Sequence, residues 1–117
     1  MIKLEGRIIS INQNNSGTVS FTFCNTDRKK IDLNGYTTIF KVKHKKNEPD
    51  SAAIISKTYS DFPEQTYTVK VDLYEQDTAH PVDCYYWAVV LKKGSYVNEA
   101  ASGPFYIIEG VIDDTGE

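Results

Sequence analysis

Apolar and polar residues alternate with a period of two through much of the chain. The segment GTVSFTF (residues 17–23) places Val19, Phe21 and Phe23 on one side and threonines and a serine on the other. Successive side chains of a β-strand point to opposite faces, so this pattern is typical of a strand with one buried face. We predict a strand here, with the three apolar side chains in the core.

Two further segments carry the same alternation, TTIFKVKH (residues 37–44) and TYTVKVDLY (residues 66–74). The side chains predicted to point inward are Phe40 and Val42 in the first segment, and Tyr67, Val69, Val71 and Leu73 in the second. Lysines, threonines and an aspartate occupy the alternate positions of both. Each segment therefore predicts a strand with one face in the core and one in solvent.

Four other segments predict strands, at residues 6–11, 52–58, 84–92 and 103–108. In the last two, the predicted inward side chains are Tyr85, Trp87, Val89, Leu91, Phe105 and Ile107. Turn sequences rich in Gly, Pro, Asn and Asp separate most neighbouring strands, and only residues 74–79 could form a helical turn. Short, regularly spaced strands without helices predict an all-β fold, an antiparallel β-sandwich of about seven strands.

Length and composition indicate one globular domain. The chain has 117 residues, of which 40% are hydrophobic and 25% charged, enough for a single core. We assign residues 1–113 to this β-sandwich domain and expect residues 114–117 to be a frayed polar tail. The N-terminal residues have no apolar run of the length that a secretory signal needs, and no segment approaches a membrane span.

The charge of the chain argues against nucleic acid as its main partner. The net charge is −3 and the two signs are mixed, whereas a basic face supplies most of the affinity for nucleic acids. The densest basic stretch is KVKHKK (residues 41–46). It is either the solvated end of a strand or a phosphate-binding patch.

The two cysteines are 60 residues apart, a spacing that suggests the inter-sheet disulfide of immunoglobulin domains. The facing of the strands argues against that bond. Cys24 has the opposite parity to the predicted core side chains of its strand or lies beyond its end, and Cys84 faces outward. Neither cysteine has a histidine nearby to make a metal site, and we expect His44 and His80 to be isolated surface residues.

No catalytic motif is present in the chain. The sequence contains no nucleophile elbow, zinc-protease motif, phosphate-binding glycine loop or dinucleotide fingerprint. Its acidic residues are scattered among predicted turns, where solvation explains them. We therefore expect a protein that is not an enzyme and that needs no cofactor or metal.

The order of these elements resembles a known family. The segment IDLNGYTTIFKVKHKKNEPDSAAIISKT (residues 31–58) resembles the pattern DLTGATVKFTVKK…AVIxKT of the immunoglobulin-like β-sandwich domain of phage baseplate upper proteins and other phage tail proteins. Residues 67–79 and 80–113 are similar to the strands that follow in that family, so the likeness spans residues 6–113. The chain departs from the pattern at residues 80–83 (HPVD), where the family usually has a Pro-Gly turn.

The resemblance implies a structural role in a bacteriophage or prophage tail or baseplate. The partners would be other tail or baseplate proteins or further copies of the chain, with no nucleic acid and no membrane. The protein would be made in the bacterial cytoplasm and then become part of the virion. The family offers no catalytic residues to carry over. Candidate contact segments are residues 1–7 and an edge strand around residues 103–108.

A carbohydrate-binding sandwich is the alternative function. Such modules bind glycans on platforms of exposed aromatic rings. The candidate surface contacts, all expected to face solvent, are Tyr59, Phe62, Tyr74, Tyr86, Tyr96 and Tyr106. Aromatic side chains also stack across strands on a solvated sheet face without any ligand. Three of these rings exposed in one plane would favour glycan binding.

Overall fold

The chain folds into an all-β structure. The computed structural model describes residues 2–5, 7–25 and 27–110. The strands are β1 (Ile2–Glu5), β2 (Ile8–Asn12), β3 (Gly17–Thr22), β4 (Thr37–Lys43), β5 (Ile55–Tyr59), β6 (Thr68–Leu73), β7 (Asp83–Lys93) and β8 (Tyr96–Ile108). Two short 3₁₀ turns, η1 (Asp50–Ala52) and η2 (Glu75–Asp77), are the only helical elements of the described ranges. All seven predicted strands are present, and β1 is an additional strand.

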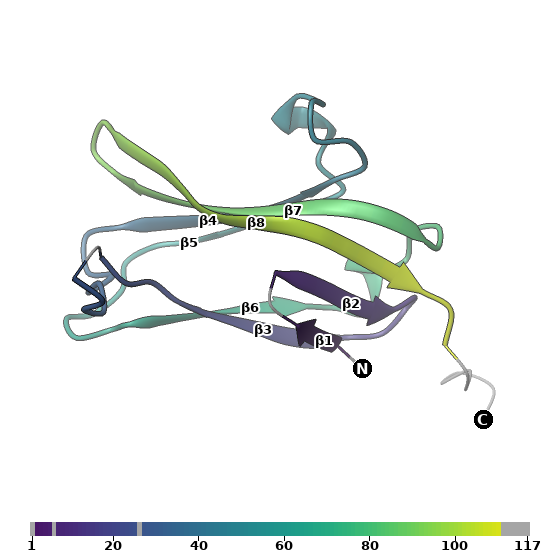
Figure 1. Cartoon of the computed structure of the whole chain (residues 1–117), viewed down its shortest axis with the longest axis horizontal. Helices are drawn as coiled ribbons and strands as arrows, with labels where there is room; N and C mark the ends of the chain where they lie inside the picture. The colour runs from purple at the N-terminus through teal and green to yellow at the C-terminus, as the bar shows by residue number, and fades with distance from the viewer. Residues whose placement is uncertain (1, 6, 26, 111–117) are drawn as a thin grey trace.

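Two sheets enclose the core. The larger sheet has the strand order β1-β2-β8-β7-β4-β5, and the smaller sheet consists of β3 and β6. The large sheet curls over the small one, and the β1–β2 hairpin lies beside β3 (Figure 1). Residues 114–117, the predicted tail, lie outside the described residues.

The larger sheet is mixed, which corrects the prediction of a purely antiparallel fold. β2 runs parallel to β8, with Ile9 opposite Phe105 and Ile11 opposite Ile107. Parallel neighbours cannot be joined by a tight turn. β2 and β8 can pair in this way because most of the chain lies between them.

The core side chains come from the alternating positions of both sheets, and the predicted facing of β3, β4, β7 and β8 is confirmed. In β6, Val69, Val71 and Leu73 are buried as predicted. Tyr67 is a correction, because its side chain is 37% exposed. β6 begins only at Thr68, so Tyr67 lies before the strand, where the alternation does not fix its direction.

The last hairpin is longer than predicted and lies differently in the sheet. β8 begins at Tyr96 and not at residue 103, and a bulge between Val89 and Val90 interrupts its register with β7. Residues 105–108 pair with β2 on their other side. The expected edge strand at residues 103–108 is therefore wrong, since the β1–β2 hairpin covers this part of β8.

Asp32 links two loops at one end of the two-sheet structure. Its carboxylate accepts hydrogen bonds from the backbone amides of Asn34, at 3.0 Å, and Gln65, at 2.9 Å. These bonds, the one from Asn34 foremost, lower the pKa of Asp32 below its ordinary value of 3.8. Gly35 completes this turn with a φ of 86°.

We expect the Asp32→Asn variant to lose less stability than the wild type as the pH falls. A lowered pKa in the folded state means that the carboxylate stabilises the fold fully above its unfolded pKa. That contribution is lost as the pH falls through the folded pKa. The slope of the unfolding free energy below about pH 4, measured by urea denaturation, should therefore be shallower in Asp32→Asn. Glu64→Gln in the neighbouring loop is the control, and equal slopes for wild type and Asp32→Asn would contradict the assignment.

Candidate binding face

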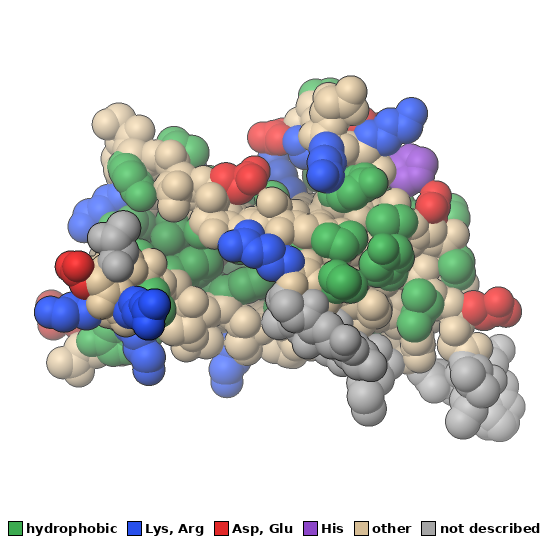
Figure 2. Space-filling view, viewed as in Figure 1, with side chains coloured by type: hydrophobic (Ala, Val, Ile, Leu, Met, Phe, Trp, Pro, Cys, Tyr) green, Lys and Arg blue, Asp and Glu red, His purple; other side chains and the backbone are tan. Residues whose placement is uncertain are grey.

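The side of the six-stranded sheet that faces away from β3 and β6, called here the outer face, is hollowed between two projections. One projection is the β4–β5 connection with η1, and the other is the tip of the β7–β8 hairpin (Figure 1). The space-filling view shows the depression between them (Figure 2). This depression, called here the outer groove, has a volume of about 860 Å³. That volume is comparable to ligand sites, which measure on the order of 300–1,000 Å³.

The floor of the outer groove is formed by small and apolar side chains. They are the outward residues of the central strands, alternating with the core residues of the same strands. Ile39 of β4 lies opposite Val90 of β7, and Ala88 of β7 lies between Lys41 of β4 and Ser102 of β8. Because Ala88 and Ser102 are short, the centre of the sheet stays low between the two projections.

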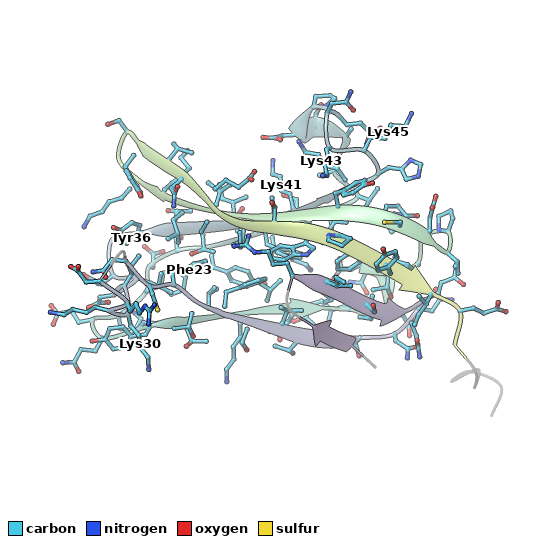
Figure 3. All side chains as sticks on the ribbon, in the orientation of Figure 1. Phe23, Lys30, Tyr36, Lys41, Lys43 and Lys45 are labelled. Carbon is cyan, nitrogen blue, oxygen red and sulfur yellow. The ribbon has the colours of Figure 1, made fainter. Side chains whose placement is uncertain are left out.

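Four lysines line the outer groove: Lys41, Lys43, Lys46 and Lys92. Lys41 and Lys43 come from alternate positions of β4 and stand above the sheet, on the side away from β3 and β6 (Figure 3). Lys46 comes from the β4–β5 connection and Lys92 from the end of β7. Asp50 and Glu99 are the carboxylates of the lining.

Lys43 fastens the β4–β5 connection to the sheet. Its ammonium lies 2.6 Å from the Asp50 carboxylate and donates a hydrogen bond to the Glu48 carbonyl oxygen at 2.8 Å. Lys41 is farther from Asp50, at 3.9 Å. The hydrogen bond from Lys43 is the main reason why the pKa of Asp50 is lowered. Lys43 is thus occupied by its own loop, whereas Lys41 has only a long contact.

The other two lysines are less constrained. The Lys46 ammonium lies 5.2 Å from the centre of the Tyr86 ring, a cation–π contact. Lys92 makes no ion pair with any residue of the described ranges. The outer groove therefore combines an apolar floor with ammonium groups that are free to meet an incoming anion.

An apolar patch adjoins the outer groove on the same face. It consists of Ile8, Tyr86, Pro104, Tyr106 and Ile108, and Ile8, Tyr106 and Ile108 are exposed. The register brings these residues together, because Tyr86 pairs with Pro104 and Tyr106 lies between Cys84 and Ser10. Hydrophobic side chains accordingly gather over β2, β7 and β8 near the C-terminal end of β8 (Figure 2).

The six aromatic candidates do not form one platform. Tyr86 and Tyr106 are the pair that the structure brings together on the outer face. Tyr74 is exposed beyond the end of β6, beneath Lys57 at 5.0 Å. Tyr96 is exposed at the tip of the last hairpin, where pairing with Lys93 gives it the opposite parity to Tyr86.

Tyr59 and Phe62 are corrections to the expectation that all six rings face solvent. Both are partly buried and pack against the core. The Tyr59 hydroxyl accepts a hydrogen bond from the Asp72 amide at 3.3 Å, which links the edge strand β5 to β6 of the other sheet. These two rings pack against the side of the core between the two sheets and do not form a flat exposed surface.

The cysteines and histidines lie apart from any metal-binding arrangement. Cys24 and Cys84 are free thiols, and Cys84 is half-buried on the outer face beside Tyr106. His44 is not isolated as predicted, because its Nε2 lies 2.9 Å from the Asp83 carboxylate. This hydrogen bond is the main cause of the lowered pKa of Asp83. In the described ranges, no three His, Cys, Asp or Glu residues cluster closely enough to hold a metal ion.

Comparisons with known proteins leave this face to be interpreted from its own chemistry. No helix among the described residues has the length and apolar character to cross a membrane. Searches against protein-family models, curated proteins and solved structures found no match to the chain.

Proposed function

We propose that the two sheets are an immunoglobulin-like sandwich. In that fold, the strands conventionally named G, F, C and C′ lie side by side in one sheet, and strands B and E pair in the other. The order β8-β7-β4-β5 and the pair β3-β6 agree with this arrangement in chain order. β2, which runs parallel to β8, takes the place of the first strand of that fold, and β1 lies outside it at the edge of the larger sheet.

A tyrosine at the start of β7 supports the same assignment. The Tyr85 hydroxyl donates a hydrogen bond to the Pro81 carbonyl oxygen at 2.7 Å. Immunoglobulin domains have such a tyrosine near the start of strand F, bonded to the backbone a few residues upstream. Here the tyrosine closes the connection from β6 to β7, the equivalent corner. Burial raises the pKa of Tyr85, so the hydroxyl stays protonated as the donor.

We propose that the protein is a non-enzymatic structural module of a bacteriophage or prophage tail or baseplate, acting through protein–protein contacts. The apolar patch carries this proposal. Contiguous exposed apolar surface on a small domain marks a contact site, and Ile8, Tyr106 and Ile108 are 43%, 37% and 41% exposed. The partners would be other tail or baseplate proteins, within the virion. The resemblance of the sequence to phage tail proteins supplies the class of assembly.

We expect the Ile8→Ser/Tyr106→Ser double variant to lose its partner while remaining folded. The exposed parts of both side chains gain little from burial within the monomer, so unfolding free energy should change by less than about 1 kcal/mol. Aromatic and aliphatic anchors at the centre of an interface can each contribute about 2 kcal/mol or more to binding. Pull-down of phage tail and baseplate proteins with the tagged protein is the measurement.

The matched control is Tyr74→Ser, which removes a ring that lies outside the patch and is more exposed than Tyr106. It should bind the tail proteins as the wild type does. Equal capture by the double variant would show that the patch is not the contact surface. Absence of any tail or baseplate partner, together with glycan binding that depends on Tyr86 and Tyr106, would favour the carbohydrate-binding alternative instead.

A further inference from the structure

The outer groove is basic although the chain as a whole is acidic. The net charge is −3, yet the groove lining holds four lysines against two carboxylates, and one of these carboxylates, Asp50, is engaged by Lys43. An excess of ammonium groups over an apolar floor fits a ligand that is both anionic and apolar. A segment with this composition occurs in the chain itself.

The sequence that follows β8 has the complementary chemistry. Residues 109–117 read EGVIDDTGE, with four carboxylates, no basic residue and the apolar pair Val111-Ile112. Glu109, which begins it, is exposed immediately after β8. The apolar pair matches the floor formed by Ile39, Ala88 and Val90, and the carboxylates match the lysines of the walls.

We propose that the outer groove binds residues 109–117 of a second copy of this chain. Within one molecule, residues 109 and 110 lead away from the outer face, toward the side of the small sheet (Figure 1). A contact between the groove of one copy and the acidic segment of the next is heterologous, and it joins copies head to tail into a ring or a filament. The inference deepens the proposed assembly role and rests on it, and it names the partner of this groove.

Lys46 and Lys92 are the residues that should meet the incoming carboxylates. Lys43 is held by Asp50 and the Glu48 carbonyl, whereas Lys46 contacts only the face of Tyr86 and Lys92 has no ion pair in the described ranges. Lys46 lies on one projection and Lys92 near the other, so the two can hold an acidic segment that crosses the floor between them. Rim pairs of this kind steer association and are weakened by salt.

The test is sedimentation velocity of the purified full chain over a range of concentrations. We expect reversible self-association that weakens as sodium chloride is raised from about 50 to about 500 mM. The groove variant Lys46→Glu/Lys92→Glu and the segment variant Asp113→Lys/Asp114→Lys should each associate at least about tenfold more weakly. Mixing the two variants should restore association. The intact groove of the segment variant can bind the intact acidic segment of the groove variant, and the glutamates of the altered groove can bind the lysines of the altered segment.

The control is Lys45→Glu/Lys70→Glu, which makes the same charge change at exposed lysines outside the groove lining. It should associate as the wild type does. A chain that stays monomeric at all concentrations, or association that the groove variant leaves unchanged, would overturn the inference. Those results leave the proposed function standing, since capture of tail proteins through the apolar patch is measured separately. If the Ile8→Ser/Tyr106→Ser variant captured tail proteins as well as the wild type while self-association stayed intact, the result would in turn count against the patch alone.

Discussion

Replacing Trp87 with alanine is expected to lower the free energy of unfolding by about 3–5 kcal/mol. The Trp87 ring is 3% exposed and lies between Phe21 and Phe40, with ring centres 5.3 and 6.1 Å away. It therefore joins β7 to a strand of the opposite sheet as well as to its own neighbour. Alanine would leave a cavity at this junction, and it would also remove the hydrogen bond from the Trp87 Nε1 to the Arg7 carbonyl at 2.9 Å.

Trp87→Phe separates these two contributions. Phenylalanine keeps most of the apolar volume but cannot donate to Arg7, so its cost should be smaller, about 1–3 kcal/mol. Urea denaturation followed by far-ultraviolet circular dichroism measures both variants, because each of them removes the tryptophan fluorescence. A loss below about 1 kcal/mol for Trp87→Ala would contradict the central position of this ring.

The facing of the core strands could be predicted because alternation is a local property. Val19 and Phe21 project from one side of β3, Phe23 directly after the strand continues the alternation, and all three are buried. The same reasoning turned Trp87 inward and Tyr86 outward on β7, and the structure confirms both. Where a strand has one solvent-exposed and one buried face, the buried positions must be apolar, so the sequence shows which residues they are.

The partners of the strands could not be predicted in the same way. Residues 96–102 (YVNEAAS) lack apolar alternation, because residues 96–99 are exposed and the small Ala100 and Ala101 only pack against the margin of the core, so the sequence does not predict this half of β8. This half of β8 forms its strand hydrogen bonds with β7, and the bulge at Val89/Val90 shifts the register between the two strands. The parallel pairing of β2 with β8 likewise depends on how distant segments meet.

For the candidate binding face, too, the facing of side chains could be predicted from the sequence, whereas the contacts between distant segments could not. Lys41 and Lys43 lie on the solvent side of β4, as the alternation of the sequence predicts. The groove also requires the β4–β5 connection to fold over that side, and the contacts of Lys43 with Asp50 and Glu48 hold it there. The prediction that Tyr59 faces solvent was wrong for a related reason. Ile54 and Ile55 are adjacent, so alternation does not determine which way the side chains of this strand face. Its position depends on Asp72 in the other sheet.

Gly103→Ala is expected to destabilise the fold by about 2–3 kcal/mol, and Gly103→Val by more. A Cβ at residue 103 would lie 2.2 Å from the Arg7 carbonyl oxygen and 3.0 Å from the Arg7 Cβ. The first atom belongs to the backbone, so it can move only if the turn between β1 and β2 moves. The same carbonyl accepts the hydrogen bond from Trp87, which pairs with Gly103 across β7 and β8. Glycine is thus required here for close approach of two chain segments.

The dependence on Arg7 makes the effect of Gly103→Ala distinguishable from general loss of packing. If the added methyl group displaces the Arg7 carbonyl, it also breaks the hydrogen bond from Trp87. The hydrogen bond between Trp87 and Arg7 is then lost in Gly103→Ala as well as in Trp87→Phe. In the Trp87→Phe background, Gly103→Ala should therefore cost less than it does alone, by about 0.5–1.5 kcal/mol. Ser102→Ala, on the outer face, is the control and should change the unfolding free energy by less than about 0.5 kcal/mol. Strict additivity of the Gly103 and Trp87 variants, measured by urea denaturation, would show that the two residues do not act through the same turn.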